Sequence, residues 1–108
     1  FDFLRSLNKN HAVFIMEDYD TSKIVASGTI LIENKLIHNN GKIGHIEDIV
    51  VDHTYRGYGL GKKIIDYLSQ YAKNEGCYKC VLDCSKDNIG FYEKCGYDNK
   101  GAQMSMYF

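Results

Sequence analysis

The chain has 108 residues with 13 basic and 14 acidic side chains, which is the length of one small domain with one modest core. The near balance of charge argues against a nucleic-acid groove or an anionic membrane as the main partner, since both select clustered lysine and arginine. Hydrophobic residues make up 44% and charged residues 25% of the chain, as in ordinary globular domains. No apolar run reaches the roughly 18 residues of a membrane-spanning helix, and the N-terminus lacks the layout of a secretory signal.

The first forty residues contain two predicted strands. Residues 1–10 are interpreted as the tail of a helix or a loose lead-in. The apolar run 12–17 and the Ile- and Val-rich segment 23–33 are predicted as strands, with a turn at Asp18-Tyr19-Asp20 between them. An antiparallel hairpin is therefore expected.

A turn at Asn39-Asn40-Gly41 leads into a third predicted strand, residues 43–52. This segment is almost continuously apolar after Asp48, which suits a central strand covered on both faces.

The second half of the chain changes to a helical period. One face of the predicted helix carries Leu60, Ile64, Leu68, Tyr71 and Ala72. Gly76 is the expected C-terminal stop. A strand over 78–84, a short helix over 87–95 ended by Gly96, and a last strand over 103–108 complete the pattern. We predict a single α+β (mixed α/β) domain over residues 1–108, with helices packed on a sheet.

Four cysteines lie near the C-terminus of the chain: Cys77, Cys80, Cys84 and Cys95. In a secreted mini-protein they would indicate a disulfide framework. Because this chain is long enough for an ordinary core and shows no export signal, we predict reduced thiols and a cytoplasmic location. A zinc site is disfavoured, since zinc knuckles normally use two C-x-x-C pairs and only one is present.

The segment R-G-Y-G-L-G-K at residues 56–62 joins an apolar strand to an amphipathic helix. Glycines let backbone N–H groups approach a ligand, and a helix start adds partial positive charge. The segment therefore predicts an anion cradle suited to phosphate or pyrophosphate. The alternative is a glycine-rich turn that only changes the chain direction. The spacing fits neither G-x-x-x-x-G-K-[ST] nor G-x-G-x-x-G.

The pattern R-x-x-G-x-G, carried by Arg56, Gly59 and Gly61, resembles the acetyl-CoA loop of the GNAT acetyltransferase superfamily. The run N-I-G-F-Y-E-K-C-G-Y at residues 88–97 resembles the other signature of that superfamily. The resemblance implies a central, mostly antiparallel sheet flanked by helices. It also implies acetyl-CoA as co-substrate and no metal.

A narrower resemblance connects the chain with the eukaryotic glucosamine-6-phosphate N-acetyltransferases. It is carried by G-H-I-E-D-I-V-V at 44–51, G-C-Y-K at 76–79, L-D-C at 82–84 and F-Y-E-K-C-G at 91–96. It implies direct acetyl transfer to the 2-amino group of glucosamine 6-phosphate, in UDP-GlcNAc biosynthesis, by a homodimer with composite sites. Alternatives are another amine acceptor, such as a protein amine or polyamine, and a non-catalytic acyl-CoA-binding module.

The same resemblance implies the cofactor-binding residues. The pantetheine arm would run along Ile49, Val50 and Val51, and Asn88, Ile89, Gly90 and Tyr92 would lie near the pantetheine and its sulfur. The pyrophosphate would lie on the loop formed by Arg56, Gly57, Tyr58, Gly59, Leu60, Gly61 and Lys62.

Tyr92 is our choice of general acid, because a phenol beside a nascent thiolate can donate a proton. The alternative is a core aromatic, since the chain has nine tyrosines. Cys84 or Cys95 as a nucleophile is conceivable, but neither has a partnered base in the sequence.

Glu47 and Asp48 are adjacent carboxylates in an otherwise apolar strand. On a regular strand they point to opposite faces, so both serve one cleft only across a bulge or splay. Buried carboxylates are costly, which favours a ligand site over the alternative of a strand-end pair. Asp83, expected midway along the next strand, is a third candidate. The resemblance implies that the three contact sugar hydroxyls and the amine, and it leaves open which accepts the proton.

The resemblance also places Lys35, Leu36, Ile37, His38 and Ile49 in the sugar-phosphate pocket. Two departures weaken the substrate assignment. Tyr107 stands where the family carries an arginine on its last strand, and the family's further N-terminal strand and helix have no counterpart here. We therefore expect that part of the substrate pocket is missing.

Overall fold

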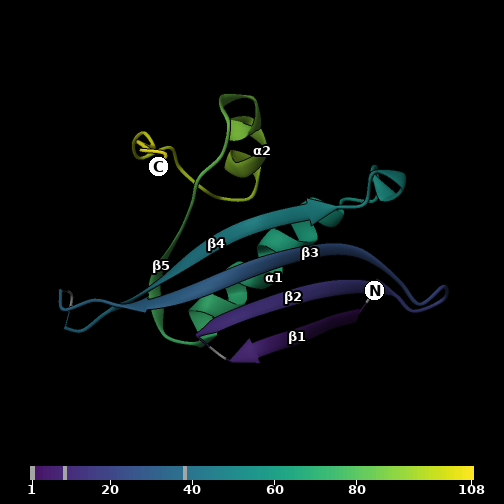
Figure 1. Ribbon diagram of the computed structural model, residues 1–108, viewed down its shortest axis with the longest axis horizontal. Helices are drawn as coiled ribbons and strands as arrows, with labels where there is room; N and C mark the ends of the chain where they lie inside the picture. Colours follow the sequence, from purple (N-terminus) through teal and green to yellow (C-terminus); the bar gives the residue numbers. More distant parts are fainter. Residues whose placement is uncertain (1, 9, 38) are drawn as a thin grey trace.

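The computed structural model describes residues 2–8, 10–37 and 39–108. They form one five-stranded sheet in the order β1-β2-β3-β4-β5. Its strands are β1 (Asp2–Asn8), β2 (His11–Asp18), β3 (Lys23–Asn34), β4 (Lys42–Val51) and β5 (Cys77–Leu82). The pairings from β1 to β4 are antiparallel, and β5 runs parallel to β4. Figure 1 shows these strands side by side, so the predicted mostly antiparallel sheet is confirmed.

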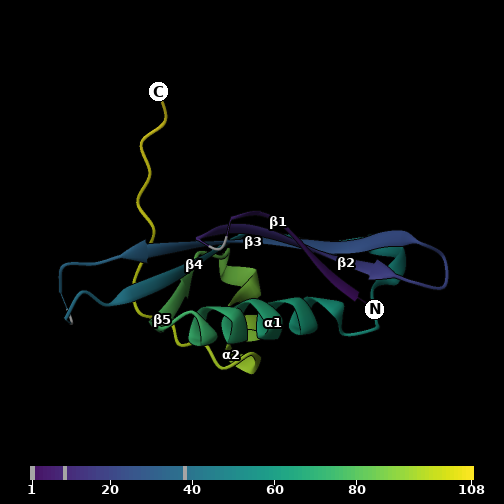
Figure 2. The ribbon, with the colours of Figure 1, turned by 90° about the horizontal axis from the view of Figure 1, so that it is seen from below.

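Helix α1 (Leu60–Asn74) is the crossover between the parallel strands β4 and β5. A short 3-10 helix, η1 (His53–Tyr55), precedes it, and η2 (Lys86–Asn88) leads into helix α2 (Ile89–Lys94). Figure 2 shows both α-helices on the same side of the sheet. None of the helices in the described part of the chain is long and apolar enough to cross a membrane.

The core lies between the sheet and α1. Alternate residues of β2 face it, namely Ala12, Phe14 and Met16, as the two-residue period of a strand requires. The predicted helical face is confirmed, with buried side chains Leu60, Ile64, Ile65, Leu68 and Ala72. Each fully buried aliphatic side chain contributes roughly 1.5–3 kcal/mol through removal from water.

Two predictions at the ends of the chain are wrong. Residues 2–8 are neither a helix tail nor a loose lead-in but strand β1, because the edge of β2 offers hydrogen-bonding partners along its whole length. Residues 103–108 form no strand. They leave the body of the molecule without a neighbouring strand, and Figure 2 shows the tail projecting past the sheet.

Strand β4 has the predicted central position but not the predicted cover on both faces. Strand β5 pairs only with residues 42–46 of β4, and Val50 in the second half is 58% exposed. Within the part of the chain that the structure describes, no strand pairs with this second half on the β5 side of β4, and α2 lies on that side (Figure 1).

Candidate active site

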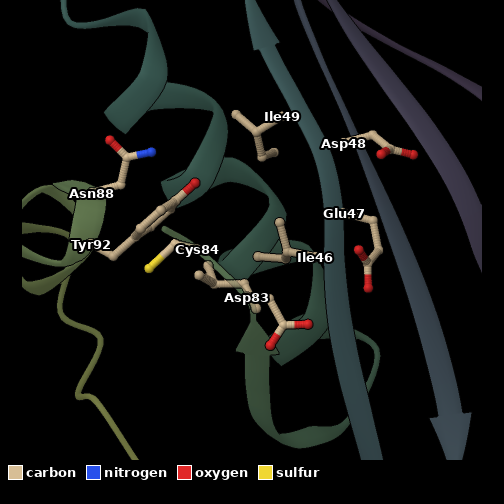
Figure 3. A pocket seen from close by; sticks show the side chains of 9 residues that line it. Ile46, Glu47, Asp48, Ile49, Asp83, Cys84, Asn88 and Tyr92 are labelled. Carbon is tan, nitrogen blue, oxygen red and sulfur yellow. The ribbon is translucent and has the colours of Figure 1, made fainter. Parts of the chain in front are cut away.

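The site is built around a bulge in β4. Ser27 of β3 pairs with Val50, and Thr29 pairs with Glu47, so Asp48 and Ile49 together face Gly28. Asp48 has a φ of +53°, the left-handed conformation that a bulge can accommodate. Because of the extra residue, Glu47 and Asp48 project from one side of β4, and Ile46 and Ile49 from the other (Figure 3). The expectation of buried carboxylates is wrong, since both are exposed.

A cavity of about 180 Å³ lies between β4, the end of β5 and α2. It brings together Asn88, Tyr92 and the three carboxylates that the sequence singled out. Strand β5 ends at Leu82, so Asp83 follows the strand and is not midway along it. Nine residues line this cavity: Ile46, Glu47, Asp48, Ile49, Leu82, Asp83, Cys84, Asn88 and Tyr92.

A second cavity of about 460 Å³ adjoins the first and shares Ile49, Asn88 and Tyr92 with it. Most of the predicted cofactor-binding residues line it. Its walls are Ile49, Val51, Tyr55, Arg56, Gly57, Gly59, Leu60, Gly61, Lys62, Asn88, Phe91 and Tyr92. Four predicted residues line neither cavity, namely Val50, Tyr58, Ile89 and Gly90.

The N-terminus of α1 forms one end of this second cavity. Gly59 precedes the helix with a φ of +71° and provides no side-chain cap. The backbone of Gly57 is also left-handed, with a φ of +92°, and a Cβ at either glycine would meet no described heavy atom within 4 Å. The first N–H groups of α1 are therefore open to an anion, and the helix dipole favours negative charge there.

Polar contacts hold the segment before this loop in place. Asp52 accepts hydrogen bonds from the backbone N–H and the hydroxyl of Thr54, at 2.9 and 2.7 Å, and lies 3.3 Å from the ammonium of Lys23. The Thr54 hydroxyl, its N–H and Lys23 together lower the pKa of Asp52 to about 2. The Tyr55 hydroxyl donates to Asp18 at 3.1 Å, which ties η1 to the end of β2.

Tyr92 lies between the two cavities. Partial burial, with a smaller effect from Cys84 and Cys95, raises the pKa of Tyr92 above its ordinary value of 10.0. The phenol is therefore protonated at neutral pH and can act as an acid. Its ring makes an edge contact with Phe91, with the centroids 5.0 Å apart.

The four cysteines, all in the described part of the chain, have free thiols. Burial raises the pKa of Cys95, which disfavours the thiolate that nucleophilic attack needs. Cys84 is exposed and lines the smaller cavity. Among the described residues, no group of His, Cys, Asp and Glu is arranged to hold a metal ion.

The structure does not bring the loop before β4 into either cavity. Lys35 pairs with Glu33 at 3.1 Å, and Leu36 and Ile37 are 94% and 59% exposed. Strand β4 begins at Lys42 after this loop, and its five residues from there to Glu47 span roughly 17 Å. Residues 35–37 therefore lie at the far end of β4 from the smaller cavity. His38 lies outside the described residues. Tyr107 is 93% exposed in the C-terminal tail.

Tyr55 and Phe91 were not predicted from the sequence, and both line the larger cavity. Phe91 lies inside the F-Y-E-K-C-G run next to Tyr92, and this position in the sequence could have predicted it. Tyr55 had no such signal, because its position depends on how η1 folds back toward β2.

Comparison with known proteins agrees with this geometry. The chain matches the Acetyltransferase (GNAT) family over residues 1–97. It is 49% identical over 108 residues to the glucosamine 6-phosphate N-acetyltransferase of Arabidopsis thaliana, covering 100% of this chain and 72% of the relative. It is 45% identical over 107 residues to glucosamine 6-phosphate N-acetyltransferase 1 of Dictyostelium discoideum, covering 99% and 68%.

Solved structures give the same result for the fold. The crystal structure of glucosamine-6-phosphate N-acetyltransferase from Arabidopsis thaliana superposes with a TM-score of 0.89 at 50% identity. That comparison covers 94% of this chain and 69% of the other. Because the family model matches most of this chain and the solved relative shares its fold, the chain belongs to the acetyltransferase (GNAT) family.

Proposed function

We propose that this chain, as one domain, transfers the acetyl group of acetyl-CoA to the 2-amino group of glucosamine 6-phosphate. The observation that carries the proposal is the pair of adjoining cavities that share Tyr92, Asn88 and Ile49. The larger cavity includes an uncapped helix N-terminus suited to a pyrophosphate. The smaller one holds three carboxylates suited to an amino sugar. The names of the relatives support this acceptor.

The residues divide the chemistry between them. The free edge of β4 at Ile49–Val51 hydrogen-bonds the pantetheine arm, and residues 57–62 hold the pyrophosphate. Acetyl-CoA supplies a thioester whose carbonyl carbon the amine attacks, so that a C–N bond forms and the C–S bond breaks. Glu47, Asp48 or Asp83, directly or through a water, accepts the proton of the ammonium.

Tyr92 then donates its proton to the departing thiolate, which leaves as CoA, and N-acetylglucosamine 6-phosphate is the second product. Both substrates are held together, so transfer is direct and needs no acyl-enzyme.

The assembly we propose is a homodimer. Exposed apolar side chains gather in the C-terminal tail, and patches of this kind mark interaction surfaces. They are Met104, Met106, Tyr107 and Phe108. Residues 35–37, too far from the cavities of their own chain, would line the site of a second copy. The free thiols suit a reducing compartment, and we propose the cytoplasm, where the product feeds UDP-GlcNAc biosynthesis.

The test is release of free thiol when the protein is mixed with acetyl-CoA and glucosamine 6-phosphate. Glucosamine and spermine are the control acceptors. Release that requires the 6-phosphate is the expected result. Release with spermine or a peptide amine alone would assign another acceptor. Heat stabilisation by CoA without release from any amine would contradict catalysis and favour an acyl-CoA-binding module.

A further inference from the structure

Helix α2 carries Tyr92, whose partly buried side chain packs against the core, but the helix itself is short. It spans six residues and contains no buried residue, and so short a helix is not stable by itself. Tyr92 and the preceding Asn88 nevertheless line both cavities. Their placement must therefore come from contacts with other elements.

Tyr97 provides a connection of this kind. Gly96, with a φ of +93°, turns the chain back after α2, and the N–H of Tyr97 donates to the Tyr92 carbonyl at 3.0 Å. The rings of Tyr92 and Tyr97 meet edge to face, with centroids 6.5 Å apart. Backbone and ring of Tyr97 thus both contact Tyr92.

The other end of Tyr97 is held by α1. Its hydroxyl lies 2.6 Å from the Ser69 hydroxyl in a partly buried hydrogen bond, which is at the short end for two oxygens. Burial raises the pKa of Tyr97 above 10.0, so the phenol keeps its proton at neutral pH. Neither Ser69 nor Tyr97 lines either of the two cavities described above.

We propose that Ser69 and Tyr97 are positioning residues, which anchor α2 to α1 and thereby hold the Tyr92 hydroxyl where the thiolate leaves. The proposal rests on the proposed function, because it assigns these residues to Tyr92 as the acid. Ser69 reaches Tyr92 through Tyr97, which makes Ser69→Ala the informative substitution.

The kinetic test compares Ser69→Ala, Ser69→Thr and Gln70→Ala with the unaltered protein. Loss of one hydrogen bond predicts that Ser69→Ala lowers kcat about 5- to 10-fold, with both KM values changed less than about twofold because no binding group is removed. Ser69→Thr keeps the hydroxyl, so we expect its kcat to match that of the unaltered protein. Gln70 is exposed on α1 and bonded to Asn74, so Gln70→Ala serves as the matched control and leaves kcat unchanged.

The same substitutions in a Tyr92→Phe background separate positioning from general support of the fold. If Ser69 acts through Tyr92, Ser69→Ala changes kcat less than about twofold once the Tyr92 hydroxyl is gone. An equal loss of kcat in both backgrounds, or no loss in either, would overturn the proposal.

A measurement that does not depend on turnover, the fluorine NMR resonance of Tyr92, tests this proposal separately from the proposed function. In protein labelled with 3-fluorotyrosine, the Tyr92 resonance is assigned by its loss in Tyr92→Phe. We expect Ser69→Ala to shift or broaden that resonance and Gln70→Ala to leave it in place. If no amine is acetylated, the proposed function has failed. An unmoved Tyr92 resonance in Ser69→Ala overturns the anchoring whatever the activity.

Discussion

Tyr92 is the one aromatic hydroxyl among the described residues that lines both cavities at a raised pKa. Replacing Tyr92 with Phe keeps the ring and removes the proton, so we expect kcat to fall about 100-fold, as for a lost general acid. The acid works only while protonated. Turnover of the unaltered protein should therefore decline as the pH rises through a value above 10, and Tyr92→Phe should lack that decline. A pH–kcat profile checks this, and unchanged turnover in Tyr92→Phe would contradict the role.

Asp52 has a different part, in stability. Its pKa is lowered from 3.8 to about 2, so its stabilising contacts are fully present above pH 4 and are lost as the pH falls toward 2. We expect Asp52→Asn to lower the Tm at neutral pH, and the gap to the unaltered protein to narrow between pH 4 and pH 2. Thermal unfolding across that range measures it.

Asp98→Asn, at an exposed carboxylate of the C-terminal segment, is the matched control for this series. A Tm gap for Asp52→Asn that is the same at pH 2 and pH 7 would show that its ionisation is not involved.

At the scale of elements, the β4 bulge depends on the small residue across from it. A Cβ on Gly28 would lie 2.6 Å from Ile49 Cδ1 and 2.9 Å from Leu68 Cδ1. Gly28→Ala should therefore overpack the core and cost about 1–3 kcal/mol of unfolding free energy. Because Ile49 lines both cavities, kcat should fall as well. Urea unfolding and kinetics test this.

Gly101, at which an added Cβ would meet no described atom within 4 Å, provides the control Gly101→Ala, expected to change neither quantity. If Gly28→Ala left the unfolding free energy and kcat unchanged, as in this control, the close packing of β3 against Ile49 would not contribute to stability or turnover.

The sequence was informative where an element carries its own pattern. Helix α1 was predicted from its apolar face and its glycines at either end, and the structure confirms it. The pair Glu47-Asp48 indicated that β4 could serve one cleft with both carboxylates only across a bulge or a splay, and the structure has a bulge there. Most of the residues that line the larger cavity also lie in the glycine loop and in the run that contains Tyr92.

Features that depend on a partner could not be predicted in this way. The segment 2–8 has no strict alternation, and it is a strand because β2 has an open edge beside it. The tail 103–108 alternates like a strand but pairs with no described strand, although β5 ends the sheet with an open outer edge. Asp83 and Cys84 lie beyond β5 because the pairing with β4 stops at Ile46, a limit that local sequence does not encode.

At the scale of the whole molecule, the proposed homodimer makes a direct prediction. Met104 is 94% and Met106 80% exposed in the tail, so burial of this segment against a second copy would remove apolar surface from water. Sedimentation should give a dimer, and removal of residues 103–108 should shift it toward monomer. Monomer alone at all concentrations would contradict the proposal.

Because Gly59 supplies no side-chain cap, the first turn of α1 is left open to an acceptor from outside the chain. Without an anion, the amide protons of Leu60, Gly61 and Lys62 have no helical acceptor, so they should exchange rapidly with deuterium. A bound pyrophosphate would act as a removable cap and slow that exchange. We expect CoA to protect peptides that span this turn and not those of β2, whereas equal exchange with and without CoA would contradict the cradle. In this way the ligand would also set the local order of the helix that binds it.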